Sequence, residues 1–315
     1  MLAQSFRDWE LLFINDGSTD GTGVIAAQYA EKDSRIRILT FSENRGIVAA
    51  LNAGLSEAKG KYIARMDADD ESHAGRLQKQ FVFLEENPST GLVSCKVLHG
   101  GDSNEQQGYA LYIDWINRLQ EPGAIFLQRF VESPFAHPSV MFRKELVDLF
   151  GGYRAGDFPE DYELWLRWMD KGVRMARLPD LLFTWNDLPA RLSRKDARCS
   201  PDAFARCKSV YLAAFLKTEI PPAKKIWLCG AGRITRQRSS FLLGQGINAA
   251  GYIDVDPGKI GKNFGGLPVI SLDQLGNPGE NFVISYIGNR GAREDIRAIL
   301  ISKGFTEGAG FIMAG

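Results

Sequence analysis

The sequence predicts an α/β protein with a mainly parallel sheet flanked by helices, followed by a second, smaller α/β domain. In the first half, apolar runs of strand length alternate with amphipathic helical patterns. Ile220-Pro221-Pro222 then interrupts the pattern, and a second alternating series begins after it. With 315 residues, of which 44% are hydrophobic, the chain can bury more than one core.

Strands and helices follow one another closely in the first half. Strands are expected at Trp9 to Ile14, Ile36 to Phe41, Lys61 to Met66 and Gly91 to Val97; helices are expected through Val24 to Tyr29, Gly46 to Ala58, Leu77 to Leu84 and Pro159 to Met169. The segment from His99 to Glu132 is less regular. Its aromatic residues fit either stacking on a sugar or ordinary packing of a helical insertion, and the sequence leaves both open.

Charge and composition exclude several classes of protein. Thirty-eight basic residues balance thirty-eight acidic ones, so we expect no nucleic-acid partner. The four cysteines are scattered, and only three histidines are present, which argues against a zinc site and for reduced thiols. No apolar run approaches the roughly 20 residues of a transmembrane segment, and no signal-peptide pattern opens the chain. We therefore expect a cytoplasmic protein, and peripheral association with the inner face of the membrane stays open.

Three carboxylates follow the apolar run that begins at Lys61. Asp67, Asp69 and Asp70 stand at the expected carboxyl end of a strand, where open α/β sheets bind ligands. Hard oxygen ligands there suit Mg²⁺ or Mn²⁺ carrying a diphosphate. The alternative is that Asp69 and Asp70 only begin the next helix, where negative charge is favourable. An isolated Asp-x-Asp favours the alternative, so the neighbouring motifs decide.

A second acidic pair opens a strongly apolar helix. In Pro159-Glu160-Asp161, the helical spacing places Asp161 on one face with Trp165 and Trp168, so its carboxylate should point towards the body of the domain. The alternative is that Glu160 and Asp161 only complement the helix dipole after a first-turn proline.

The second domain carries a glycine-rich turn. Gly230-Ala231-Gly232 follows an expected strand at Lys225 to Cys229, and Asp254 ends the next strand, which suggests a Rossmann-like nucleotide pocket. The fingerprint is incomplete, because Thr235 stands in place of the third glycine. Gly230, Gly232 and Asp254 are therefore a candidate second nucleotide site.

In this order the motifs resemble family 2 of the nucleotide-sugar-dependent glycosyltransferases, which have the GT-A fold. The resemblance rests on an ordered series of segments and not on one motif. These segments are Phe13 to Thr22, Asn44-Arg45-Gly46, Leu51-Asn52-Ala53-Gly54, Ala64 to Asp70, His137 to Arg143, Gly151-Gly152-Tyr153 and Glu160 to Arg167.

The resemblance implies a role for each acidic landmark. Asp16 is expected to contact the nucleobase or ribose, and Asp67 and Asp69 to hold Mn²⁺ or Mg²⁺ on the donor diphosphate. Asp161 is expected to be the general base that takes the proton of the acceptor hydroxyl. Arg65 and Glu160 join Asp16 and Asp67 as expected substrate-binding residues. His137 receives only a supporting role, because a single histidine in an apolar strand is usually a satisfied core residue.

The resemblance also shows a departure at the beginning of the sequence. Family members open with an apolar strand and a helix that precede a segment like Leu2 to Phe6, and here Met1 falls where that helix would be. The first strand of the fold is missing from this sequence. A sheet without it exposes unpaired backbone groups. The hypothesis is that Met1 is a misplaced start or that this is a truncated form with weak or no activity.

These features define three domains and one leading function. Residues 1–198 are expected to form the GT-A domain, 199–222 a helical linker and 223–315 the small Rossmann-like domain. The expected activity is inverting transfer of a sugar from a nucleotide-diphosphate sugar, UDP-linked donors included, to a glycan or lipid-linked acceptor in polysaccharide or glycoconjugate biosynthesis. One alternative is a catalytically weak or inactive, transferase-like protein that acts as a nucleotide-sugar binding or partner module. Another is a nucleotide-sugar dehydrogenase built on the Gly230 motif.

Overall fold

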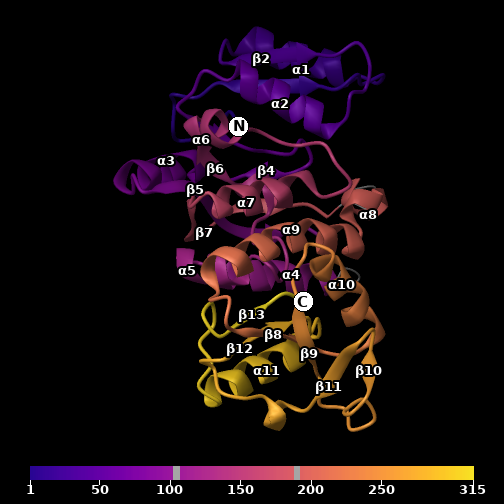
Figure 1. The fold of residues 1–315 in the computed structure, drawn as a ribbon. Coiled ribbons are helices and arrows are strands. Elements are labelled where there is room, and N and C mark those ends of the chain that lie inside the picture. Colours follow the sequence, from indigo (N-terminus) through magenta and orange to yellow (C-terminus); the bar gives the residue numbers. More distant parts are fainter. Residues whose placement is uncertain (102–106, 188–191) are drawn as a thin grey trace. The chain divides into compact units, whose positions relative to one another are not determined.

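The computed structural model describes residues 1–101, 107–187 and 192–315 (Figure 1). These residues form two compact units. The first unit comprises 1–122, 135–156 and 163–195, and the second comprises 123–134, 157–162 and 196–315. The stretch 199–222 therefore groups with the small α/β domain in the second unit. The two units are described separately below.

The first unit begins with a two-stranded parallel sheet. Strands β1 (Leu11–Asn15) and β2 (Ile36–Thr40) pair in register, and helices α1 (Thr22–Lys32) and α2 (Ile47–Glu57) follow them. Four of the five side chains of β1 are only half-buried. Parallel strands are usually buried on both faces and paired on both edges. The described residues give β1 a partner on one edge alone.

A mixed five-stranded sheet forms the centre of the first unit. Its strand order is β3-β6-β5-β7-β4. The β5–β7 pair is parallel, and the β3–β6, β5–β6 and β4–β7 pairs are antiparallel. The bounds are β3 (Tyr62–Ala64), β4 (Glu71–Ser72), β5 (Thr90–His99), β6 (Met141–Arg143) and β7 (Arg174–Trp185). Strand β3 is shorter than the apolar run after Lys61 predicts. Its three residues are half-buried or exposed, whereas the apolar run predicts a buried strand.

Helices surround this sheet. They are α3 (Arg76–Glu86), α4 (Gln107–Arg118), α6 (Glu145–Phe150), α7 (Glu160–Asp170), α8 (Leu192–Lys195) and the single turn η1 (His137–Ser139). Helix α7 begins in the second unit and continues into the first. No helix in the described ranges is long and apolar enough to cross a bilayer.

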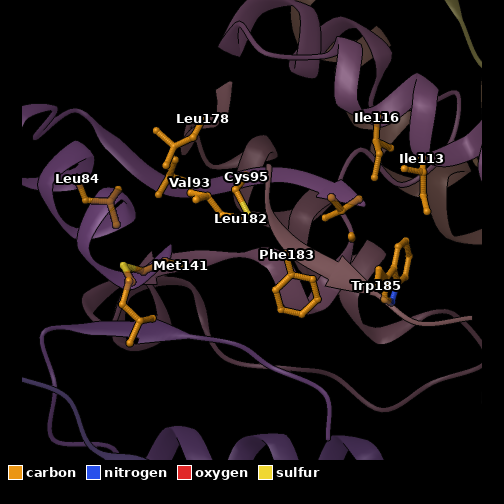
Figure 2. Close-up of a cluster of buried hydrophobic side chains, with 13 residues drawn as sticks. Leu84, Val93, Cys95, Ile113, Ile116, Met141, Leu178, Leu182, Phe183 and Trp185 are labelled. Carbon is orange, nitrogen blue, oxygen red and sulfur yellow. The ribbon is translucent and has the colours of Figure 1, made fainter. Parts of the chain in front are cut away.

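The core of the first unit joins β5 and β7 to α3 and α4. Figure 2 shows Val93 and Cys95 of β5 beside Leu178 and Leu182 of β7, with Leu84 of α3 at one end of the cluster. Ile113 and Ile116 of α4 lie at the other end, near Trp185. Continuous burial of β5 from Thr90 to Cys95 is typical of a central strand covered on both faces. This core holds the carboxyl ends of β5 and β7 at one rigid edge.

The second unit is a small α/β domain with an almost entirely parallel sheet. The strand order is β10-β11-β9-β8-β12-β13, and only β10 runs antiparallel to its neighbour (Figure 1). The strands are β8 (Lys225–Cys229), β9 (Ala249–Ile253), β10 (Asn263–Phe264), β11 (Leu267–Ile270), β12 (Asn281–Ser285) and β13 (Phe311–Met313). The helices and single turns are α5 (Pro122–Gln128), η2 (Ala197–Cys199), α9 (Pro201–Glu219), α10 (Arg233–Leu243), η3 (Leu272–Gln274) and α11 (Arg290–Ser302).

A buried lysine connects three parts of the second unit. Lys208 of α9 is 6% exposed, and its Nζ donates to the carbonyl oxygens of Phe130 at 2.8 Å, Val131 at 3.3 Å and Ala314 at 2.6 Å. Three acceptors match the three N–H groups of an ammonium. Burial, followed by the charge of Arg238, lowers the pKa of Lys208 to about 7. The side chain thus joins the 130–131 segment and the end of β13 to α9.

The lowered pKa of Lys208 predicts that the free energy of unfolding rises with pH. The folded-state pKa of about 7 lies below the unfolded value of about 10.4, so the unfolded chain binds the extra proton between these two values. The free energy of unfolding should therefore increase by about 1.4 kcal/mol per pH unit in that window, relative to Lys208→Met. Urea unfolding of both proteins at several pH values from 7 to 10 measures the difference. Parallel curves for the two proteins would contradict the prediction.

Candidate active site

The acidic cluster follows β3 in the first unit. One carboxylate oxygen from each of Asp67, Asp69 and Asp70 lies within 4.8 Å of the others. Asp69 is exposed, Asp67 is half-buried and Asp70 is buried. Oxygens around one Mg²⁺ lie at most about 4.2 Å apart, since each is about 2.1 Å from the ion. A small side-chain rotation would close the set, so the three residues fit a hard divalent cation.

The alternative role of Asp69 and Asp70 as a helix start is wrong. They are followed by β4, and α3 begins only at Arg76 with Gly75 as its N-cap residue. The Asp70 carboxylate instead accepts a hydrogen bond from the backbone N–H of Asn186 at 2.8 Å. The carboxylates therefore belong to a turn between two short strands.

Strand β7 supplies a residue that the sequence analysis missed. Asn186 directly follows this strand, and its side-chain amide donates to the backbone oxygen of Asp69 at 2.6 Å. Its backbone N–H also binds Asp70. The signal in the sequence is an apolar run, Leu181 to Trp185, that ends in Asn186 and Asp187, as the run after Lys61 ends in acidic residues. Two strand ends thus hold one loop.

Arg65 lies beside the cluster and pairs with one of its carboxylates. Its Nη1 forms an ion pair with Asp67 Oδ1, and the Arg65 side chain is 8% exposed. The backbone N–H of Arg65 continues the pairing with β6 through Val140 O at 3.0 Å. Arg65 therefore lies next to the carboxylates, and its charge offsets part of theirs.

A fully buried arginine supports the chain at this point. Arg76 donates to Arg65 O at 2.7 Å, to Val140 O at 3.2 Å and to Gln80 Oε1 at 3.0 Å. Burial lowers its pKa to about 10, so the guanidinium is charged at neutral pH. Because it binds the backbone oxygens that follow β3 and precede β6, Arg76 positions the loop.

Substitution of Arg76 is expected to destabilise the protein strongly. Arg76→Met leaves buried carbonyl and amide oxygens without their donor, and we expect the free energy of unfolding to fall by about 2–4 kcal/mol. Urea unfolding measures it. Arg118→Met is the matched control, because Arg118 is exposed at the end of α4 and should change little. Equal effects of the two substitutions would contradict the positioning role.

Asp16 organises a neighbouring loop of the first unit. Its two carboxylate oxygens accept from the backbone N–H groups of Arg45 at 2.7 Å and Gly46 at 3.0 Å, directly before α2. Gly17 has φ of +71°, and a Cβ there would lie 2.5 Å from the carbonyl carbon of Glu43, so only glycine fits. Each carboxylate oxygen has a second lone pair, so Asp16 keeps acceptor capacity for a ligand.

His137 is a satisfied core residue, as expected from its type. It lies in the turn η1 and not in the strand that the apolar pattern predicts, because the backbone turns at Pro138 before β6 begins. Its Nε2 lies 2.7 Å from Tyr153 Oη. Burial, followed by the charge of Arg65, holds the pKa of His137 well below its usual value, so the ring is neutral.

Glu160 and Asp161 begin α7 within the second unit. Glu160 is 9% exposed, and Asp161 is half-buried, with Oδ1 accepting from the backbone N–H of Tyr162 at 2.7 Å. Burial and then the charges of Glu160, Asp161 and Asp196 raise the pKa of Cys199 to about 11. Glu160 and Asp161 thus bring two carboxylates to the start of this helix, and Arg198 interacts electrostatically with Glu160.

The glycine turn of the second unit is held by the carboxylate that follows β9. Asp254 Oδ2 accepts from Ala231 N at 2.7 Å and from Lys259 Nζ at 3.2 Å, and Oδ1 accepts from Asp256 N at 2.9 Å. Gly230 has φ of +99°, which favours glycine. Gly230, Gly232 and Asp254 are thus brought together, with Asp254 largely engaged by the protein itself.

Comparison with known proteins agrees with these landmarks. The model of the family described as Glycosyl transferase family 2 matches residues 1–150. The chain is 30% identical over 222 residues to the O-antigen biosynthesis glycosyltransferase WbnJ of Escherichia coli, covering 69% of this chain and 81% of that protein. The chain belongs to glycosyl transferase family 2. The putative glycosyltransferase EpsE of Bacillus subtilis is 36% identical over 187 residues, which are 58% of this chain and 64% of EpsE. The chain thus spans less than two thirds of that relative's length.

Solved structures share the fold of this family 2 member. Staphylococcus aureus TarS matches with a TM-score of 0.52 and 17% identity, over 77% of this chain and 39% of that one. A shorter form, TarS 1-349 in complex with UDP-GlcNAc, matches with a TM-score of 0.51 and 16% identity, over 77% and 64% of the two chains. This likeness confirms the expected GT-A-type α/β fold.

Proposed function

We propose that this chain is a metal-dependent, inverting glycosyltransferase that uses a nucleotide-diphosphate sugar as donor. The observation that supports it most is the convergence of Asp67, Asp69 and Asp70 within 4.8 Å in a member of this family. The related WbnJ is an O-antigen biosynthesis enzyme, and the TarS structure holds UDP-GlcNAc. A UDP-linked donor and a glycan or lipid-linked acceptor in polysaccharide assembly are therefore the first candidates.

In this proposal the donor lies between two loops of the first unit. Asp16 accepts a hydrogen bond from the nucleobase or ribose through its free lone pairs, and Arg65 lies towards the diphosphate beside Asp67. Asp67 and Asp69 hold Mn²⁺ or Mg²⁺, and Asp70 is a further candidate ligand. When bound, the ion supplies Lewis-acid stabilisation of the negative charge on the departing nucleoside diphosphate.

The acceptor is activated by a carboxylate of the chain. Asp161 takes the proton of the acceptor hydroxyl while that oxygen attacks the anomeric carbon, and the bond from this carbon to the diphosphate oxygen breaks. A single displacement inverts the anomeric configuration. Glu160, the neighbouring carboxylate, contributes to acceptor binding in this proposal.

A panel of nucleotide sugars tests the function. The full chain is incubated with each donor, with and without Mn²⁺, and the released nucleoside diphosphate is measured. We expect turnover of one donor class that depends on the added metal. Binding of a donor without any turnover would instead favour the second candidate, a transferase-like binding module, for which the half-buried, singly paired strand β1 is the motivating observation.

A further inference from the structure

Two strand-to-helix turns lie side by side at the carboxyl edge of the sheet in the second unit. Strands β8 and β12 are paired up to Cys229 and Ser285, and a Cβ on Gly230 would lie 3.1 Å from Ile287 Cδ1. From β8 the sheet continues to β9 and β11 on one side and to β12 and β13 on the other. Open α/β sheets bind ligands at such a reversal of strand order.

Two arginines lie near the second of these turns, one on α10 and one at the start of α11. Arg238 Nη1 is 3.9 Å from the position that a Cβ would take on Gly288, and Arg290 is the first residue of α11. Within the described ranges, neither arginine has a carboxylate at ion-pair distance. Arg238 Nε is also buried without a hydrogen-bond partner. Both arginine residues are half-buried.

Further cations make this edge strongly positive. Lys208 and Arg293 are 6% and 5% exposed, and Arg293 Nη1 donates to Gly315 O at 2.7 Å, at the end of the chain that follows β13. The facing carboxylate is Glu132, which reaches solvent and is influenced by Arg290, Lys208 and Arg293. Glu294 pairs mainly with Arg297. Arg290, Lys208 and Arg293 thus act on one carboxylate that has no close ion pair of its own among the described residues.

The opposite side of the glycine turn is negative. Asp254 accepts from Ala231 N, and Asp256 and Lys259 surround it. A phosphate is therefore repelled from the β9 side of the turn and attracted to the β12 side, where Arg238 and Arg290 lie. The N-termini of α10 and α11 add partial positive charge at the same edge.

We propose that this edge is a second ligand site, which binds the phosphates of a nucleotide through Arg238 and Arg290. The site is separate from the acidic cluster of the first unit and needs no divalent metal, since the protein supplies the positive charge. The diphosphate lies over the turns at Gly230 and Gly288, with Arg293 as a fixed supporting charge.

Titration calorimetry on the full chain tests the site in the presence of EDTA, which removes metal from the first unit. The probes are inorganic pyrophosphate, ADP, UDP and NAD. We expect a nucleotide to bind, with a dissociation constant at least tenfold higher in Arg238→Gln and in Arg290→Gln. Lys262→Gln, which removes an exposed charge beside β10, should leave it unchanged. Asp67→Asn combined with Asp69→Asn should also leave it unchanged.

The measured affinities for the four probes decide whether the site exists and whether its ligand is a nucleotide. Tighter binding of a nucleotide than of pyrophosphate supports the proposal, and equal binding of the two overturns the nucleotide as ligand. Absence of binding by all four probes, or equal affinity in the wild type and both arginine variants, overturns the site. If a glutamine variant fails to fold, Arg290→Lys replaces it, and its affinity should fall while the melting temperature is kept, because lysine cannot form the paired hydrogen bonds of a guanidinium.

Discussion

Asp69→Asn is expected to lower donor turnover by about 10³-fold, and Asp67→Asn is expected to lower it by a similar factor. The substitution removes one negative charge from the proposed metal ligands, and stabilisation of developing charge by such a site contributes several kcal/mol to the transition state. The loop should persist, because Asn186 binds Asp69 through its backbone oxygen and not through its carboxylate. Released nucleoside diphosphate at saturating Mn²⁺ measures turnover, and calorimetry with Mn²⁺ alone measures the lost metal affinity.

The matched control for this prediction is Asp8→Asn. Asp8 is an exposed carboxylate of the same unit that lies outside the acidic cluster. Its replacement should leave both turnover and Mn²⁺ binding unchanged. Full turnover by Asp69→Asn and by Asp67→Asn, with Mn²⁺ affinity intact, would exclude the metal site.

The second large effect is expected for Asp161→Asn. Loss of a general base reduces the chemical step by about 10²- to 10⁴-fold, so kcat should fall by that amount while the KM for the donor stays within about twofold. Asparagine keeps the side-chain oxygen that accepts from Tyr162 N, so the start of α7 is preserved.

Asp170→Asn serves as the control on the same helix. Asp170 is exposed at the far end of α7 and pairs with Lys171. It should retain wild-type kcat. If Asp161→Asn does the same, the base is another residue, and the assignment to Asp161 is wrong even where turnover depends on metal.

Local pattern was sufficient for most elements. Strand β8 begins and ends where the apolar run from Lys225 to Cys229 predicts, and α2 matches the stripe from Ile47 to Leu55 within its expected limits. Local pattern also located the acidic residues. Glycine, asparagine and aspartate directly after an apolar run indicate a loop at a strand end, even when the residues that contact this loop are unknown. Strand β7 was missed, because arginine, proline and aspartate interrupt its apolar pattern and its parallel pairing with β5 is non-local.

The sequence by itself determined the family, the α/β class and the identity of Asp16, Asp67, Asp69 and Asp161 as candidates, since ordered motifs and periodicity are properties of the chain. Only the tertiary structure decided that Asp70 joins the cluster, that Asn186 and Arg76 hold it, and that Asp254 faces inward on its own turn. It also placed Arg238 beside the turn at Gly288 that precedes Arg290. These contacts join residues far apart along the chain, and their hydrogen bonds and charges depend on distances that spacing in a sequence does not contain.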